Sequence, residues 1–386
     1  MKAGLIALIA GYVLSQFYRA FLAVLSPVLA SDLGATPEIL ATASGYWFLA
    51  FALMQLPVGA ALDRIGPRLT TSGLLAVGAV GAAIFASATG PNAIVYAMVL
   101  IGAGCAPVLM AAYFLFARLY PPSAFGTLAG MVIGIGSLGN IAASLPLSAA
   151  VDLLGWRGTI WVLAALTLLT ALAVLIFVRD PARSQTGHKG SVLDLLRMPA
   201  LWPIFLMMAA CYAPAAGLRG LWAGPYLSDV FDADRAEIGR VTLVMGLAMV
   251  AGNFAYGPLE RIFGTRKGLI FGGNAIVLAC LLTIAAFPET QPLLLLPAIG
   301  LFGASFPMVM AHGRAFLPAH LTGRGVTLIN LFGIGTTGVM QYATGHLHAA
   351  LTPAPPNVPY IGIMLAYAGL VALGLTAYLW SKDRTD

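Results

Sequence analysis

Long apolar stretches alternate with short polar connections along the whole chain of 386 residues. Roughly 20 apolar residues in an α-helix cross a bilayer core about 30 Å thick. Twelve stretches meet this length and predict twelve transmembrane helices, at residues 4–29, 39–61, 69–88, 93–116, 125–150, 158–178, 201–227, 241–259, 268–287, 291–312, 325–348 and 358–380. The polar connection at 179–200 is longer than the others and lies at the middle of the chain. We therefore expect a six-helix bundle at 1–178, a central loop at 179–200 and a second six-helix bundle at 201–386.

The composition supports a membrane protein. Hydrophobic residues make up 60% of the chain and charged residues only 9%, whereas a soluble protein has about 25% charged residues. This excludes a soluble enzyme and a disordered chain. Cys105, Cys211 and Cys280 all lie within apolar stretches, which suggests neither a disulfide framework nor a metal site. We expect no cofactor and no metal, and the net charge of +6 does not imply a nucleic-acid partner.

The basic residues are distributed unevenly over the connections. If the N-terminus lies inside the cell, fifteen lysines and arginines fall on the cytoplasmic side and three on the other side. Loops rich in lysine and arginine stay in the cytoplasm. The first apolar stretch is too long for the core of a signal peptide. We therefore predict a multi-pass protein of the cell inner membrane with both termini in the cytoplasm.

The second half of the chain is a degenerate copy of the first, at a distance of about 200 residues. The matching pairs are Tyr12 and Tyr212, Arg19 and Arg219, and Pro107 and Pro307. A loop pattern is also repeated. It reads glycine, three residues, acid, base, one residue, glycine, one residue, base at 59–68, and recurs in a looser form at 257–267, with Glu260 as the acid and one extra residue before Gly264. One half therefore repeats the helix order of the other.

The acid of this loop lies at a helix end, where it can pair with arginines and cap a neighbouring helix. Such contacts would hold the two bundles together in one state and break in the other. The residues expected to act in this gate are Asp63, Arg64 and Arg68 in the first loop, and Glu260, Arg261 and Arg266 in the second.

The loop pattern resembles the hallmark loop of the major facilitator superfamily, and the resemblance covers all twelve spans and both halves. It implies an all-α membrane protein with the major facilitator fold, in which two pseudo-symmetric six-helix bundles enclose a substrate site near the midplane. It also implies a secondary transporter, not an enzyme, in which one bundle rocks against the other. The chain has no phosphate-binding loop of the kind that a primary pump needs.

Two arginines lie well inside apolar stretches, one in each half. A basic residue at the centre of a spanning helix costs about 2.5–3.5 kcal/mol on insertion scales, and all fourteen acidic residues fall in loops or at span ends. We therefore expect an anionic substrate to balance Arg19 and Arg219, since a guanidinium binds carboxylate or phosphate oxygens in pairs. The alternative is that these arginines bind backbone carbonyls or reach the membrane interface.

Helical spacing groups further side chains with these arginines. Tyr12, Ser15, Gln16 and Arg19 would lie on one face of the first span, and Tyr212, Arg219, Trp222 and Tyr226 on one face of the seventh. The expected substrate-binding residues are Arg19, Arg219, Tyr12, Tyr212, Gln16, Trp222 and Tyr226. The arginine pair resembles that of the organophosphate:phosphate and organic anion antiporters, in which a first-span and a seventh-span arginine bind the phosphoryl group. By this resemblance Arg19 and Arg219 are the anion ligands.

Other polar residues and glycines in the spans have structural roles in this interpretation. Gln55, Asn140, Asn274 and Gln341 are expected to form hydrogen bonds between helices. The glycine rows at 130–139 and 333–338 are expected to form packing surfaces between the bundles.

The function that fits these features is secondary active transport of a small organic or inorganic anion. An empty site would hold two facing positive charges that oppose closure, which favours exchange of the substrate for a counter-anion by a monomer in the lipid bilayer. The alternative function is a proton-coupled exporter of drugs or other amphipathic solutes, with Trp47 and Trp222 lining an apolar pocket. His312, near the cytoplasmic end of the tenth span, is the candidate proton site.

Overall fold

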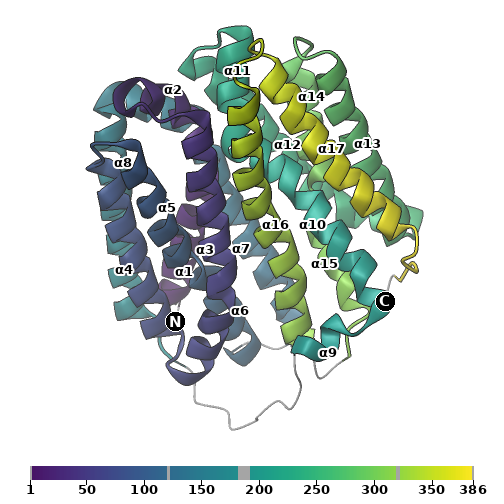
Figure 1. Ribbon diagram of the computed structural model, residues 1–386. Helices are drawn as coiled ribbons and strands as arrows, with labels where there is room; N and C mark the ends of the chain where they lie inside the picture. Colours follow the sequence, from purple (N-terminus) through teal and green to yellow (C-terminus); the bar gives the residue numbers. More distant parts are fainter. Residues whose placement is uncertain (1, 120–121, 181–191, 319–321, 385–386) are drawn as a thin grey trace. The chain divides into compact units, whose positions relative to one another are not determined.

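The computed structural model describes residues 2–119, 122–180, 192–318 and 322–384, and every regular element in these ranges is a helix (Figure 1). The first half contains α1 (Lys2–Tyr18), α2 (Leu22–Leu33), α3 (Pro37–Arg64), α4 (Pro67–Ala86), α5 (Pro91–Cys105), α6 (Pro107–Leu119), α7 (Pro122–Ala142) and α8 (Leu145–Phe177). The second half contains α9 (Val192–Leu196), η1 (Pro199–Leu201), α10 (Trp202–Gly217), η2 (Leu218–Trp222), α11 (Ala223–Phe231), α12 (Arg235–Phe263), α13 (Arg266–Ala286), α14 (Pro292–Gly303), α15 (Phe306–Arg314), α16 (Thr322–Leu351) and α17 (Val358–Tyr378). The expected all-α fold is confirmed.

The helices have the length and apolarity of a multi-pass membrane protein. In the described part of the chain, nine helices are long and apolar enough to cross a bilayer, and a tenth span results if α1 and α2 count as one bent span. The expected fifth span corresponds to α7, whose stretch Met131–Ala142 is a shorter apolar helix. The expected eleventh span corresponds to α16, which has 30 residues but carries threonine, glutamine and histidine side chains.

The chain divides into two compact units. Unit 1 contains residues 1–185 and 234–240, and unit 2 contains residues 186–233 and 241–386. The division falls inside the polar connection expected at 179–200, and the first residues of α12 group with unit 1. Most of that connection, residues 181–191, lies outside the described residues.

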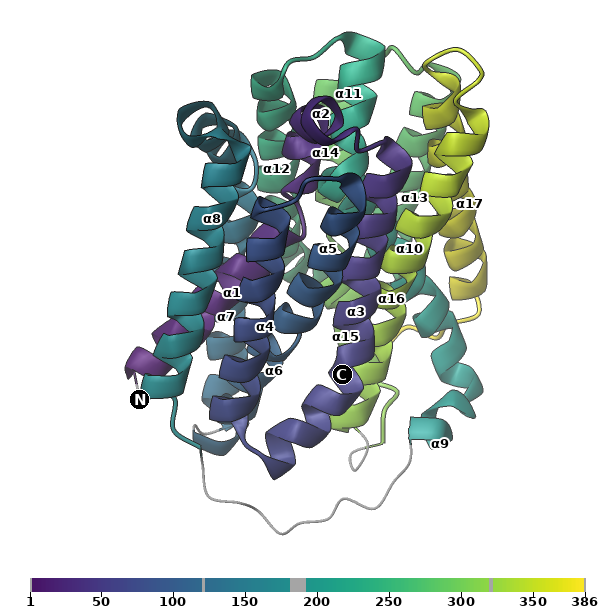
Figure 2. The ribbon, with the colours of Figure 1, turned by 60° about the vertical axis from the view of Figure 1, so that its left-hand side comes forward.

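The repeat is visible as interruptions at matching positions of the two units. In unit 1, α1 and α2 are bent by 55° relative to each other across residues 19–21. The two differently directed helices can be followed in Figure 2. In unit 2, α10 continues into the five-residue π-helix η2. The spans that contain Pro107 and Pro307 are also broken, between α5 and α6 and between α14 and α15. Proline has no N–H to donate and clashes with the carbonyl four residues earlier, so it favours a break just before it.

Polar side chains bind the backbone or side-chain groups at these breaks. A break in an apolar bundle leaves groups without intrahelical partners, and neighbouring helices must supply them. The donor–acceptor pairs are Gln341 Nε2 to the Gly217 carbonyl (3.1 Å), Gln55 Nε2 to the Ala106 carbonyl (3.3 Å) and Asn274 Nδ2 to Ser305 Oγ (3.0 Å). The expected interhelical hydrogen bonds of Gln341, Gln55 and Asn274 are confirmed.

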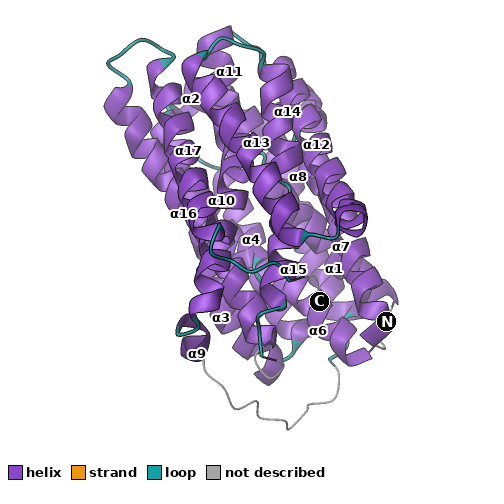
Figure 3. Cartoon of the chain, turned by 90° about the vertical axis from the view of Figure 1, so that its right-hand side faces the viewer, coloured by secondary structure: helices purple, strands orange, loops and turns teal. Residues whose placement is uncertain are grey.

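In unit 1, the backbones of neighbouring helices come close together at positions where a glycine has no side chain. Figure 3 shows the helices of the chain. A Cβ atom on Gly139 of α7 would lie 1.9 Å from the carbonyl oxygen of Val13 in α1. A Cβ atom on Gly104 of α5 would lie 2.5 Å from the Cα atom of Gly78 in α4. Small residues allow this close approach between membrane helices.

Three glycines of the two predicted rows pack within their own unit. Gly136 and Gly139 pack against α1 of the same unit, and Gly333 packs against Phe306 and Met208 of its own unit. The expectation that these three glycines form a surface between bundles is therefore wrong. Their spacing indicates close helix approach but does not indicate which helix approaches.

The turn between the fifth and sixth spans lies within the connection that the sequence predicts, at residues 151–157. The helix α8 contains one non-helical residue, Gly155, whose φ is 69°. Glycine adopts a positive φ without the steric penalty of a side chain. The residues expected at the end of the fifth span, up to 150, therefore continue into α8, and the turn between the two spans lies at Gly155.

The contact between α1 and α7 predicts the effect of Gly139→Ala. The added methyl group overlaps the backbone of α1, which cannot move like a side chain, so overpacking should lower the free energy of unfolding by about 1–3 kcal/mol. Thermal unfolding of the purified protein in detergent measures this. Gly73→Ala is the matched control, because no atom lies within 4 Å of a Cβ there and alanine favours a helix. Equal unfolding temperatures for both variants would contradict the packing.

Candidate functional site

Arg19 lies at the bend between α1 and α2, where its side chain packs on two rings of α3. The guanidinium carbon lies 4.7 Å from the centre of the Phe51 ring and 5.3 Å from that of Trp47. Both rings are buried and stack on each other at an interplanar angle of 17°. A guanidinium over an aromatic face gains about 0.5–2 kcal/mol, more when it is shielded from water. The aromatic pair therefore fixes the half-buried cation of Arg19 at the bend.

Tyr12 and Gln16 form a second group on α1, directed toward α7. The Nε2 atom of Gln16 donates to the Tyr12 hydroxyl at 2.7 Å, and Asn140 Nδ2 donates to Gln16 Oε1 at 3.5 Å. The Tyr12 ring occupies the space left by Gly136. The structure thus brings Tyr12 and Gln16 together, whereas Arg19 contacts α3.

Arg219 is the second residue of the π-helix η2 and is only 3% exposed. A Cβ atom on Gly246 of α12 would lie 2.7 Å from Nη2 and 2.9 Å from Nε of Arg219. The guanidinium therefore occupies the room that a side chain at position 246 would take. Pro214, in the preceding turn of α10, removes one backbone donor and favours the irregular geometry that follows.

Trp222 and Tyr226 follow Arg219 but pack against other elements. Trp222 Nε1 donates to Thr344 Oγ1 of α16 at 3.0 Å, and the Tyr226 hydroxyl donates to the Pro288 carbonyl at 2.5 Å. A π turn holds more residues than an α turn, so it changes the register of the side chains beyond it. Trp222 and Tyr226 nevertheless both contact the ring of Tyr360 in α17, with ring centres 6.5 Å and 5.5 Å away, and a single face shared with Arg219 stays a prediction.

Tyr212 lies in α10, before the π turn, and its ring centre is 4.9 Å from that of Phe306 at the start of α15. This contact brings the seventh span next to the break in the tenth. The roles of Tyr12, Gln16, Tyr212 and the two aromatic residues after Arg219 as substrate ligands stay predictions.

In unit 1, the helix that follows the repeated loop is capped by a residue that sequence reasoning missed. Asp180 Oδ1 accepts a hydrogen bond from the backbone N–H of Arg68 at 2.9 Å, and Arg68 Nε donates to the Leu175 carbonyl at 2.6 Å. The Asp63 side chain lies outside the described part of the structure, and Arg64 is exposed. The described cap of α4 thus comes from the residues that follow α8, and the contacts expected of Asp63 lie outside the described residues.

Unit 2 repeats this arrangement. Asp383, which follows α17, accepts hydrogen bonds from the Lys267 backbone N–H at 3.0 Å and from the Thr265 hydroxyl at 2.5 Å. The Lys267 ammonium group donates to the Leu379 carbonyl at 2.7 Å. A carboxylate after the last helix of each unit therefore caps the third span of that unit. The signal in the sequence is a basic residue followed by aspartate after the last span of both halves, at 179–180 and 382–383.

The second loop contains one of the expected ion pairs. Glu260 Oε1 lies 2.7 Å from Arg266 Nε, and both side chains are mostly shielded from solvent. Arg261 is exposed. The gating roles of these residues, and of Arg64 and Arg68, stay predictions.

His312 is fixed by hydrogen bonds at both ring nitrogens. Nε2 lies 2.9 Å from the Lys382 carbonyl, and Nδ1 lies 2.5 Å from the Tyr378 hydroxyl. Nε2 also lies 3.3 Å from the backbone nitrogen of Arg384, so both ring nitrogens contact the C-terminal end of the chain. His312 therefore joins α15 to the C-terminal end of α17, and its use as a proton site stays a prediction.

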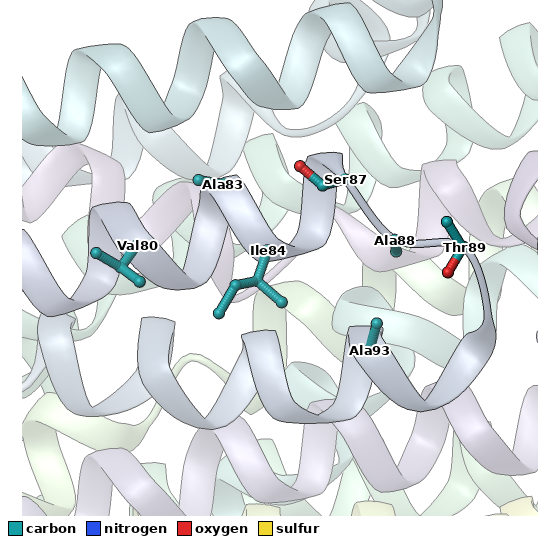
Figure 4. Close-up of a pocket in the computed structure, with 7 residues that line it drawn as sticks. All are labelled: Val80, Ala83, Ile84, Ser87, Ala88, Thr89 and Ala93. Atoms are coloured by element: carbon teal, nitrogen blue, oxygen red, sulfur yellow. The ribbon is translucent and has the colours of Figure 1, made fainter.

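A surface hollow of about 370 Å³ lies in unit 1 at the end of α4 and the start of α5 (Figure 4). None of its lining residues is titratable, so it has no group that would bind an ion. It is lined by Val80, Ala83, Ile84, Ser87, Ala88, Thr89 and Ala93.

The sequence profile of the Major Facilitator Superfamily matches residues 8–333, which is most of the chain. No curated protein matches the sequence significantly. The family match covers both arginine turns and both copies of the repeated loop.

Solved transporter structures resemble the chain over nearly its full length. A D-xylose–proton symporter has a TM-score of 0.78 at 13% identity and covers 98% of this chain and 96% of its own. A bacterial homologue of the human lysosomal transporter Spinster, in an inward-facing and occupied conformation, has a TM-score of 0.75 at 17% identity, with 97% and 95% covered. A variant of the nucleoside transporter NupG has a TM-score of 0.75 at 14% identity, with 98% and 99% covered. At this identity the likeness shows the fold alone.

The cap formed by Asp383 makes the stability of unit 2 depend on pH. Partial burial raises the pKa of Asp383, but hydrogen bonds from the Thr265 hydroxyl and the Lys267 amide outweigh burial and hold the pKa below its usual value of 3.8. The carboxylate therefore stabilises the folded state above the unfolded pKa, and this contribution is lost as the pH falls through the folded pKa.

We predict that Asp383→Asn lowers the free energy of unfolding by about 0.5–2 kcal/mol at neutral pH, the usual value of a lost cap. The difference from the wild type should shrink below about pH 4. Thermal unfolding at a series of pH values measures it. Asp232→Asn is the control, because Asp232 is exposed and asparagine also tolerates its left-handed conformation. A difference that does not change with pH would contradict the role of the carboxylate.

Proposed function

The chain belongs to the major facilitator superfamily and is a membrane transporter, not an enzyme, and we propose that it carries a small organic or inorganic anion. Carriers of this superfamily are secondary transporters that work by alternating access. The cargo we propose is a carboxylate or a phosphate, and the groups that bind it are Arg19 and Arg219.

The observation that carries this proposal is the placement of one shielded arginine at an interrupted span in each half. Arg19 follows the last residue of α1, and Arg219 lies in η2, exactly 200 positions later in the sequence. In secondary transporters, interrupted helices form the sites for substrates and coupling ions. A charge inside a membrane protein is costly and normally marks a pathway for an ion or a substrate.

The geometry of each arginine is compatible with binding an anion. The Arg19 guanidinium lies over the rings of Trp47 and Phe51, and a guanidinium binds an anion through its N–H donors. Arg219 is almost fully buried, where the lower dielectric strengthens its attraction for an anion. A planar fork of donors suits two oxygens of one carboxylate or phosphate.

The proposed mechanism is exchange of the substrate for a counter-anion. Without an anion the two guanidinium groups add their positive charges, and a bound anion removes this unfavourable charge from the carrier. A loaded carrier therefore changes state more readily than an empty one. From the distribution of lysine and arginine we also propose that the protein lies in the inner membrane with both termini in the cytoplasm. We further propose that it acts as a monomer.

A second candidate function is proton-coupled export of drugs or other amphipathic solutes. It is favoured by the ring pairs Trp47–Phe51 and Tyr212–Phe306, which offer apolar contact area. In this case Arg19 would only stabilise the bend by its contact with the rings. Two of the similar structures belong to transporters of D-xylose and of nucleosides, which carry no charge of their own, and their low identity leaves the cargo to be decided by the residues of this chain.

Arg19→Gln and Arg219→Gln test the proposal, because each removes a charge and keeps a polar side chain. A stability screen of carboxylates and phosphates first identifies a ligand that raises the unfolding temperature of the wild type. Uptake of that labelled anion into proteoliposomes should be stimulated by the same anion on the other side. We predict that each variant loses uptake by about 100-fold, the effect of losing two charge-assisted hydrogen bonds.

Three further variants serve as controls. Arg157→Gln removes an arginine with 46% side-chain exposure and should leave uptake unchanged. Gly246→Ala should reduce uptake because its methyl group displaces the Arg219 guanidinium, whereas Gly272→Ala in α13 of the same unit should not, because no atom lies within 4 Å of a Cβ there. Normal anion uptake by both glutamine variants, or transport only of uncharged amphipathic solutes, would rule out the proposed cargo.

A further inference from the structure

His348 lies in α16 of unit 2, packed between two aromatic rings and only 6% exposed. Its ring stacks on Trp222, with ring centres 5.3 Å apart and an interplanar angle of 27°. Tyr360 of α17 contacts it edge-on, with ring centres also 5.3 Å apart. The helices α16 and α17 lie side by side at this point (Figure 1). An imidazole is thus held inside the bundle by aromatic faces.

Trp222 connects this histidine to the turn that holds Arg219. It is the last residue of η2, three positions after Arg219, and its Nε1 atom donates to Thr344 of the same helix as His348. The stacking of Trp222 on His348 and its hydrogen bond to Thr344 together attach the end of the π turn to α16. A change at the imidazole therefore acts on a side chain of the Arg219 turn.

Tyr360 connects the histidine to a carboxylate. Its hydroxyl donates a hydrogen bond to Asp229 Oδ2 in α11. The titratable and charged groups connected to His348 through these contacts are Tyr360 in α17, Tyr226 and Asp229 in α11, and Arg219 in η2. The same elements also carry Tyr342 and His346 in α16, and Tyr367 and Tyr378 in α17. His348 is thus connected to the negative charge of Asp229 through Tyr360, and to the turn that carries the positive charge of Arg219 through Trp222.

The two other histidines that the structure describes pack against other groups. His312 is bonded at both ring nitrogens and joins the end of α15 to the C-terminal segment. His346 is exposed on α16, where its ring contacts Tyr342. His348 is buried and contacts the π turn directly.

We propose that His348 is a proton-binding site coupled to the anion site at Arg219. A protonated imidazole is attracted to the face of Trp222 and to the carboxylate of Asp229, whereas the positive charge of Arg219 opposes protonation. An anion bound at Arg219 weakens this opposition. Proton binding and anion binding therefore favour each other, and by linkage the anion binds more tightly at low pH. The proton site stands on its own geometry, and only its coupling to cargo rests on the proposed function.

Tryptophan fluorescence of the purified protein tests the proton site without any anion. A protonated imidazole stacked on an indole quenches its emission, so the wild type should show a step in fluorescence as His348 takes up its proton. His348→Gln should abolish the step, and His346→Gln, the exposed neighbour on the same helix, should keep it. Trp222→Phe removes the reporter and keeps the aromatic packing, so it should also abolish the step.

The coupling to Arg219 is tested in the same titration. Arg219→Gln removes a positive charge and should move the step to higher pH by roughly 0.5–1 unit, and Asp229→Asn should move it to lower pH. Arg157→Gln should leave it in place. A step that persists in His348→Gln or in Trp222→Phe would overturn the proton site, and a step that Arg219→Gln does not move would overturn the coupling. Because no anion is present, failure of anion transport would leave these results standing.

Discussion

A positive charge buried in an apolar helix bundle must be held in place by its surroundings, and each half of this chain holds one where a span is interrupted. Arg19 is held at a bend by two stacked rings. Arg219 lies in a π turn, where its guanidinium occupies the room that a side chain at position 246 would take. The interruptions are themselves costly, because they remove helical hydrogen bonds in surroundings that contain no water. The interior polar residues, the glycines and the helix caps are best understood as responses to these two costs.

The polar residues of the interior have consistent roles in this view. Gln341 binds the Gly217 carbonyl where the π turn begins, and Gln55 and Asn274 bind groups at the two other breaks. Residues of this kind are easily taken for substrate ligands, since they are polar and lie in membrane spans. Here these three side chains donate hydrogen bonds to groups at the helix breaks. The two arginines therefore stand out as the candidate substrate ligands. The fold and the candidate site thus depend on the same few interruptions.

The sequence predicted the membrane class, the family and the internal repeat, because each of these depends on length, apolarity and spacing. It also placed Arg19 and Arg219 at matching positions. It did not predict the π turn at 218–222 or the contact of Trp222 with His348, because a single irregular turn leaves no mark in the spacing of apolar residues. It failed as well where contacts join distant segments, since no local pattern shows that Asp180 caps α4 or that Gly139 packs on α1.

The most direct test of the central claim locates the anion itself. Crystals of the wild type grown with selenate, and separately with a brominated carboxylate, would show the bound anion by its anomalous scattering. The account predicts an anomalous peak within hydrogen-bonding distance of the guanidinium group of Arg19 or Arg219, and no such peak in the Arg219→Gln and Arg19→Gln proteins. Anomalous peaks only at exposed lysines and arginines, with none at Arg19 or Arg219 at a saturating anion concentration, would contradict it.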